Sequence, residues 1–146
     1  MIERDVYLVP TLVAPFFIVE NGIHGGIPKY AVEKASRVMD SHRKSFRKAK
    51  KAGVKIAMGT DAGTPFNVHG KYPHELKLMV ESGMTPMEAI VAATKSSSKL
   101  LGIDKKYGTL KEGKNADFLV LKENPLENLD TLFEIAQVYK LGKLVK

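Results

Sequence analysis

The sequence contains no cysteine, and that absence removes several kinds of chemistry at once. Disulfides, a catalytic thiolate and cysteine-bound zinc are excluded, so any metal must be held by histidine, a carboxylate or a modified side chain. A long apolar run is also lacking, because charges of both signs open the chain and Pro10 and Pro15 interrupt the apolar stretch behind them. This start resembles neither a signal peptide nor a membrane span, and we expect a soluble cytoplasmic protein.

Acidic residues are fewer than basic ones, 16 against 23, which gives a formal charge of +7. A polyanion must therefore be considered as a partner. The positive charge is concentrated in residues 43–51 and at the chain end, without the interleaved aromatic residues on which bases stack. We interpret residues 43–51 as the solvated face of a helix, keep nucleic-acid binding through them as a weaker alternative, and expect no membrane partner.

The most informative stretch joins an apolar run to an acidic turn. Val54 to Met58 has the length and composition of a buried strand, and Gly59-Thr60-Asp61-Ala62-Gly63 follows it. This arrangement places a carboxylate at the carboxyl end of a strand, where α/β folds carry their ligand sites. Asp61 is also a residue type that caps turns, so its position alone leaves both a functional and a structural interpretation open.

The pattern over residues 1–103 predicts alternating strands and helices. A strand at 6–9, a helix from Pro28 to a stop at Gly53 and a strand at 54–58 form a βαβ unit with a parallel strand pair. A glycine-dense loop at 21–26, either an active-site flap or a flexible connection, precedes this helix. Beyond the 64–72 loop we expect helices at 73–82, 86–93 and 96–101, the second with a Thr85-Glu88 capping box.

From residue 104 the pattern becomes β-rich. It predicts turns between short strands at 107–115, a strand at 116–121, a helical turn at 129–133 and a terminal hairpin around Leu141-Gly142. A unit of about 40 residues rarely folds alone, so it must pack on something else.

The four histidines have separate interpretations. We expect His42 to be a partly buried helix residue, His74 to be packed or exposed at a helix start, and His24 to lie at the surface or to reach a ligand from its glycine-rich loop. A private metal site formed by Asp61, His69 and His74 is conceivable but follows no standard ligand spacing.

A series of short motifs resembles the carboxyl-terminal portion of the amidohydrolase superfamily, in particular imidazolonepropionase-like hydrolases and metal-dependent dipeptidases and carboxypeptidases. The resemblance covers the chain from Tyr7 to Lys146. Its residues are 59–63, His69-Gly70, Glu75-Leu76, 83–90, 92–94, Leu101-Gly102, 108–110, Gly113-Lys114, 116–118 and 124–126.

The resemblance implies an α/β fold with two parts. Residues 1–103 would supply the last two βα units of a (β/α)8 barrel, and residues 104–146 part of a composite β-sandwich. Asp61 matches the family aspartate that ligates the catalytic divalent metal, most often zinc, and takes the proton from the attacking water. His69 matches a position beside the substrate pocket.

The other metal ligands of the family lie in sequence that this chain does not contain, and no His-x-His pair occurs here. We therefore expect a fragment or separately encoded piece of a hydrolase of C–N bonds in cyclic amides or small peptides, with little activity alone. The alternative is a non-catalytic oligomer or assembly partner. The expected partners are further copies or a missing amino-terminal barrel portion, and the lone chain holds either no metal or one completed by a neighbouring copy.

Overall fold

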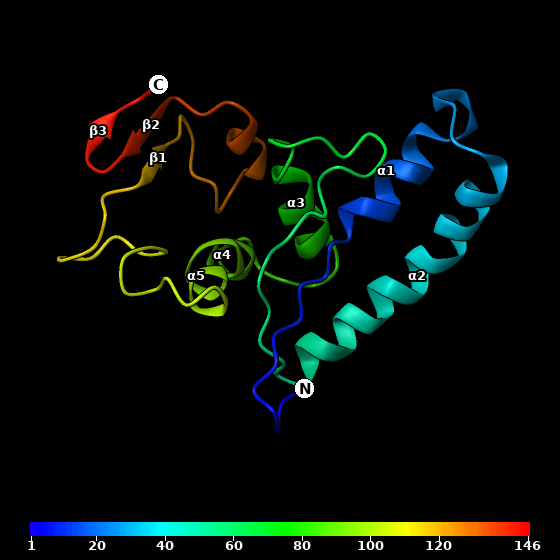
Figure 1. Cartoon of the computed structure of the whole chain (residues 1–146), viewed down its shortest axis with the longest axis horizontal. Helices are drawn as coiled ribbons and strands as arrows, with labels where there is room; N and C mark the ends of the chain where they lie inside the picture. Colours follow the sequence, from blue (N-terminus) through cyan, green and yellow to red (C-terminus); the bar gives the residue numbers. More distant parts are fainter.

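A computed structural model describes residues 1–146 and shows an α/β chain with few strands (Figure 1). The helical part occupies the first hundred residues, and a small sheet lies near the carboxyl terminus. The helices are α1 Val13–Asn21, α2 Lys29–Lys51, α3 Pro73–Glu81, α4 Pro86–Val91 and α5 Ser97–Leu100, with short 3₁₀ turns at Ile23–Gly25 and Leu129–Phe133; the strands are β1 Phe118–Val120, β2 Gln137–Lys140 and β3 Lys143–Leu144.

The predicted parallel pair at 6–9 and 54–58 is present but short. Leu8 and Ile56 form a single parallel bridge, in which the Leu8 N–H donates to the Lys55 carbonyl (2.8 Å) and the Ala57 N–H to the Leu8 carbonyl (3.0 Å). The backbone groups of Tyr7, Val9 and Ile56 make no backbone hydrogen bond. The pair is therefore an isolated piece of sheet with two open edges.

Helix α1 was not predicted, because its sequence VAPFFIVEN is apolar on nearly every side and shows no helical period. The structure explains this pattern. α1 packs against both α2 and α3, and Val13 and Phe17 are buried. Pro15 falls in the first helical turn, where the missing N–H removes no intrahelical bond.

Helix α2 confirms the predicted helix between Pro28 and Gly53. Phe46 is 1% exposed on its apolar face, and His42 is half-buried as expected. Nine Lys and Arg residues lie on α2 against two acids, so this helix carries the whole formal charge of +7. Its last turn is basic, which suits the negative end of the helix dipole.

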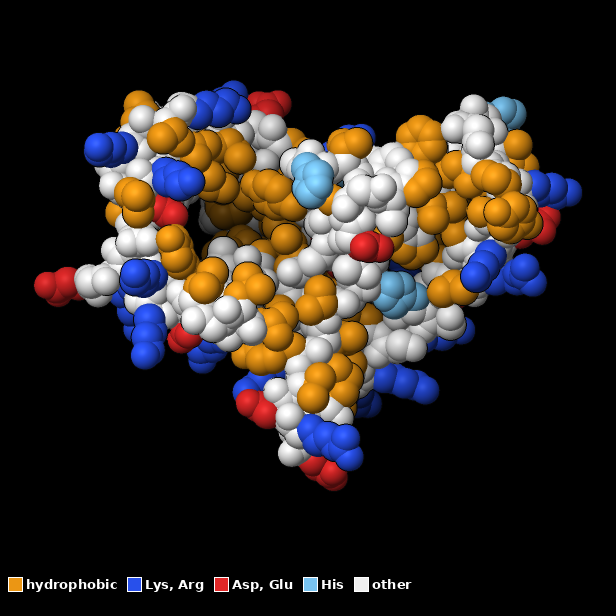
Figure 2. Space-filling model, viewed as in Figure 1, with side chains coloured by type: hydrophobic (Ala, Val, Ile, Leu, Met, Phe, Trp, Pro, Cys, Tyr) orange, Lys and Arg blue, Asp and Glu red, His pale blue; other side chains and the backbone are white.

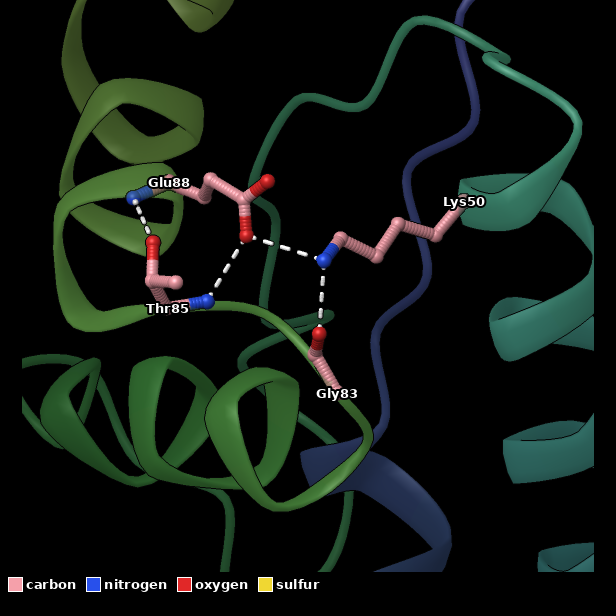
Figure 3. Close-up of polar contacts among 4 residues, drawn as sticks. All are labelled: Lys50, Gly83, Thr85 and Glu88. Carbon is pink, nitrogen blue, oxygen red and sulfur yellow. Dashed lines mark hydrogen bonds and ion pairs between the residues drawn. The ribbon is translucent and has the colours of Figure 1, made fainter.

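The capping box at α4 is confirmed, and a lysine from α2 joins it (Figure 3). The Glu88 carboxylate accepts from the Thr85 N–H (2.7 Å), and the Thr85 hydroxyl accepts from the Glu88 N–H (3.2 Å). The Lys50 ammonium lies 2.9 Å from Glu88 and donates to the Gly83 carbonyl (2.6 Å). Beyond Val91 the chain continues through a π-helical turn, Ala92–Ser96, into α5, so the separate helix predicted at 96–101 is the end of one longer helix.

The carboxyl-terminal strands form an antiparallel sheet in the order β1-β2-β3. The predicted hairpin is confirmed, because Leu141 and Gly142 both have positive φ (52° and 76°), as a type I′ turn requires. The turns predicted at 107–115 are confirmed, but no short strand precedes them. That segment consists of turns, which the Lys114 ammonium closes by donating to the carbonyls of Asp104 and Tyr107.

The 3₁₀ turn Leu129–Phe133 attaches the β-rich part to α3, as its small size required. Thr131 and Leu132 are buried, and the Lys77 ammonium lies 2.6 Å from the Asp130 carboxylate. The core as a whole is small: 21 of 146 residues are buried, and the main apolar cluster has 11 members, Phe46 and Met79 among them. Hydrophobic side chains gather at the surface, including around a hollow between the sheet and α4–α5 (Figure 2). No helix is long and apolar enough to cross a membrane.

Candidate functional site

The carboxyl ends of the two parallel segments meet at Gly59. A Cβ atom at this glycine would lie 2.6 Å from Val9 Cγ1 and 3.7 Å from Thr11 Cγ2. Since real Cβ contacts are not that short, Gly59 allows the chain leaving the second segment to pass directly beside the end of the first. The turn with Asp61 therefore begins at the edge where both segments end.

Asp61 adopts an uncommon backbone conformation for a residue with a side chain, with φ +53°. The residue is exposed, and its carboxylate forms no hydrogen bond or ion pair within the chain. Its carbonyl accepts from the side chains of Thr64 (3.2 Å) and Asn67 (3.1 Å). The backbone of Asp61 is thus fixed by the loop that follows, while its carboxylate is left free for a ligand.

His69 lies in the same loop and is also exposed. Its imidazole makes no hydrogen bond, and Gly70 behind it has φ +94°. The structure places His69 within the segment that connects Asp61 to α3 but does not join the two side chains. Its predicted contact with a substrate stays a prediction.

No three histidine, aspartate or glutamate side chains come together in a way that could hold a metal ion. Asp61, His69 and His74 are therefore not brought into a common group. A catalytic zinc normally takes three protein ligands and keeps one open position. The free, exposed carboxylate of Asp61 suits a ligand role, but the ligand set within these 146 residues is incomplete.

His74 takes part in an aromatic cluster instead. Its ring lies 5.1 Å from Phe17 and 4.9 Å from Phe133, both edge to face, and is stacked with Phe16 at 6.4 Å. Burial lowers the pKa of His74, and the charge of Lys71 lowers it further. This histidine is a packing residue between α1, α3 and the carboxyl-terminal turn, in keeping with one of its two predicted interpretations.

Glu75 is a buried carboxylate to which the sequence analysis assigned no role. It is 0% exposed, and its two carboxylate oxygens accept from the backbone N–H groups of Leu12 (3.0 Å) and Val13 (2.7 Å). Burial raises its pKa to about 7, against the opposing effect of those two hydrogen bonds. The carboxylate caps α1 and ties the segment after the first strand to α3. A glutamate in the first turn of a helix is ordinary, so no signal in the sequence set Glu75 apart.

Known proteins resemble this chain in both sequence and fold. The sequence model described as the amidohydrolase family matches residues 1–145. The chain is 40% identical to ochratoxinase of Aspergillus niger over 152 residues, which is 100% of this chain and 30% of ochratoxinase. It is 30% identical to an imidazolonepropionase of Thermoplasma volcanium over 96 residues, covering 65% of this chain and 22% of that protein.

Among solved structures, an Xaa-Pro dipeptidase with methionine bound in its active site matches with a TM-score of 0.87 and 41% identity. The match covers 100% of this chain and 36% of the dipeptidase. This chain thus spans about a third of such relatives and corresponds to their carboxyl-terminal part. The resemblance inferred from the motifs is confirmed.

Proposed function

The chain belongs to the amidohydrolase family, and from this premise we propose that it is the carboxyl-terminal portion of a metal-dependent hydrolase of C–N bonds. Members of this family generally depend on a metal. In the proposal, residues 1–103 supply the last two βα units of a (β/α)8 barrel, and residues 104–146 supply part of a β-sandwich. The similarity to an Xaa-Pro dipeptidase and an imidazolonepropionase supports small peptides or cyclic amides as substrates.

The observation that carries the fragment part of this proposal is the excess of exposed surface. The accessible surface is 9386 Å². A folded monomer of this mass, 16.1 kDa, exposes about 7,400 Å² according to the usual scaling of area with mass. The difference of roughly 2,000 Å² is larger than one partner contributes to a standard protein interface. Together with the two open sheet edges at Tyr7 to Val9 and at Ile56, it supports a missing surface that completes the fold.

Asp61 would then have two tasks in the completed site. Its carboxylate would be one of several metal ligands, and a divalent metal bound there would supply a water whose pKa is lowered to about 7. Asp61 itself would accept the proton of the attacking water and return it to the leaving nitrogen. His69 and the loop from Thr64 to Tyr72 would lie against the substrate. The absence of further ligands on this chain leads us to expect little or no activity from it alone.

A second function is favoured by the same exposed surface. The chain would be a non-catalytic oligomer or assembly partner, in which copies of the chain cover one another's open edges and Asp61 binds no metal. The two functions differ in whether the chain needs an amino-terminal barrel portion or only further copies of itself to cover its open edges. Under both, the isolated chain is not a compact monomer. A light-scattering mass of one chain with cooperative unfolding would contradict both.

The test is a graft onto the Xaa-Pro dipeptidase, in which this chain replaces the carboxyl-terminal 36% that it matches. We expect the graft to bind metal and to hydrolyse an Xaa-Pro dipeptide. Asp61→Asn should lower kcat by about 100-fold or more, the usual contribution of a proton-transfer group. Asp40→Asn, which removes an exposed carboxylate from α2, is the matched control.

Elemental mass spectrometry on the lone chain completes the test. Less than one metal per chain there, with a metal-loaded and active graft, supports the hydrolase fragment. A folded graft that keeps full activity with Asp61→Asn would overturn the role of Asp61. A lone chain that retains about one metal would instead indicate a site completed by neighbouring copies.

A further inference from the structure

Asn67 is a buried polar residue in the loop behind Asp61. It is 1% exposed, and its side-chain amide donates to the carbonyls of Thr60 (2.5 Å) and Asp61 (3.1 Å) and lies 3.3 Å from the Thr64 hydroxyl. Its backbone takes part as well, because its N–H donates to the Thr64 carbonyl (3.0 Å) and its carbonyl accepts from the Gly63 N–H (2.8 Å). The turn from residue 60 to 67 thus closes on one side chain.

This arrangement compensates for the conformation of Asp61. A left-handed φ is uncommon for a residue with a Cβ atom and persists where the surroundings fix it. The amide of Asn67 binds the carbonyls on both sides of the Asp61 N–Cα bond, which is the bond that φ describes. The Asp61 carboxylate has no partner within the chain, so within these residues only the backbone fixes the direction of the Cα–Cβ bond that carries it.

We propose that Asn67 is a positioning residue, which holds Asp61 at positive φ and thereby directs its carboxylate toward the metal. The proposal rests on the ligand role proposed for Asp61. The residue type matters, because an amide offers two N–H donors on one planar group, whereas an ionised aspartate at 67 would direct an acceptor at two carbonyl oxygens. Alanine would leave those carbonyls without their partner.

The first test measures the conformation of Asp61 on the full chain, without metal. In NMR spectra of the labelled protein, a residue with positive φ shows an intense nuclear Overhauser effect between its own amide and α protons. We expect this signal at Asp61 in the wild type and its loss in Asn67→Ala and Asn67→Asp. Asn21→Ala is the matched control, since the Asn21 amide also donates to a carbonyl, that of Phe17 (2.8 Å), but at the end of α1.

The second test uses the metal-binding graft, with Mn²⁺ affinity as the readout. Loss of a residue that orients a metal ligand typically weakens binding by about 10- to 100-fold. We expect a loss of that size for Asn67→Ala and an unchanged affinity for Asn21→Ala. The combination of Asn67→Ala with Asp61→Asn should bind no more weakly than Asp61→Asn alone.

The outcomes separate this inference from the proposed function. If Asn67→Ala leaves the Asp61 signal in place, or weakens Mn²⁺ binding equally with and without the Asp61 carboxylate, the positioning role is wrong. If the signal is lost but Asp61→Asn keeps full metal affinity and activity, Asn67 still sets the backbone of Asp61 and the ligand role is the part that fails.

Discussion

Replacing Glu75 by glutamine should change how the stability of the chain depends on pH. The side chain keeps its size, but an NH₂ group replaces one of the two carboxyl oxygens, each of which can accept a hydrogen bond even when the carboxyl is protonated. Glutamine can then accept from only one of the two N–H groups at Leu12 and Val13, and its own NH₂ group faces the other. A buried donor left without an acceptor costs about 1–3 kcal/mol. At pH 5 we therefore expect the variant to be less stable than the wild type by about that amount.

The pH dependence follows from the raised pKa of Glu75. Burial shifts that pKa from an ordinary 4.5 to about 7. Below pH 4.5 the carboxyl is protonated in both the folded and the unfolded chain. Between pH 4.5 and 7 the unfolded chain gives up this proton while the folded chain retains it, so the free energy of unfolding falls as the pH rises. A shift of this size is worth roughly 3 kcal/mol, all of which is lost above pH 7.

Glutamine has no proton to lose, so Glu75→Gln should gain roughly 3 kcal/mol relative to the wild type between pH 4.5 and pH 8. The variant would then be less stable at pH 5 and as stable or more stable at pH 8. The measurement is urea unfolding from pH 4.5 to 8 at one protein concentration, because association also contributes to the apparent stability. Taking the difference between the two proteins removes the contribution of His74, whose pKa is lowered and which acts in the opposite direction.

Glu81→Gln is the control, because it removes an exposed carboxylate from the same helix. We expect its stability difference from the wild type to stay constant across the range. If the difference between Glu75→Gln and the wild type is equally constant, Glu75 does not titrate as a buried group and the reasoning is refuted.

Two further predictions concern the packing of α2. Lys50→Met removes the ion pair with Glu88, whose side chains are partly exposed, and should lower the free energy of unfolding in urea titrations by about 1 kcal/mol. The control Lys51→Met, at an exposed position with no ion pair, should change it by less than about 0.5 kcal/mol. Equal effects of the two substitutions would show that the link from Lys50 to the capping box contributes nothing. Phe46→Ala removes the most buried side chain of α2 and should lower the free energy of unfolding by about 3–5 kcal/mol in the same measurement. The control is Val38→Ala, at a position that is 46% exposed, and should lower it by less than about 1 kcal/mol. A decrease below about 1 kcal/mol for Phe46→Ala would mean that the core collapses around the gap.

Local structure could be predicted from the sequence wherever residues close together in the chain determine it. The Thr85-Glu88 capping box, the basic end of α2 and the Leu141-Gly142 turn were each predicted from neighbouring residues and are confirmed. The turn with Asp61 was also located, because a glycine-flanked acid behind an apolar strand is a local pattern. Helix α1 was missed for the opposite reason: it packs on α2 and α3 through Val13 and Phe17, but its other sides are apolar too, so no polar face reveals its period.

The sequence by itself determined the family, the helix and turn signals, and the candidate carboxylate at Asp61, since each depends on residue types at fixed spacing. Only the tertiary structure decided which distant groups meet. It placed Glu75 against the N–H groups of Leu12 and Val13, more than 60 residues away, and His74 among aromatic rings. It also showed Asn67 closing the turn on Asp61. Such contacts are set by how helices pack and loops close, which depends on the whole chain at once, and spacing along the sequence carries no record of them.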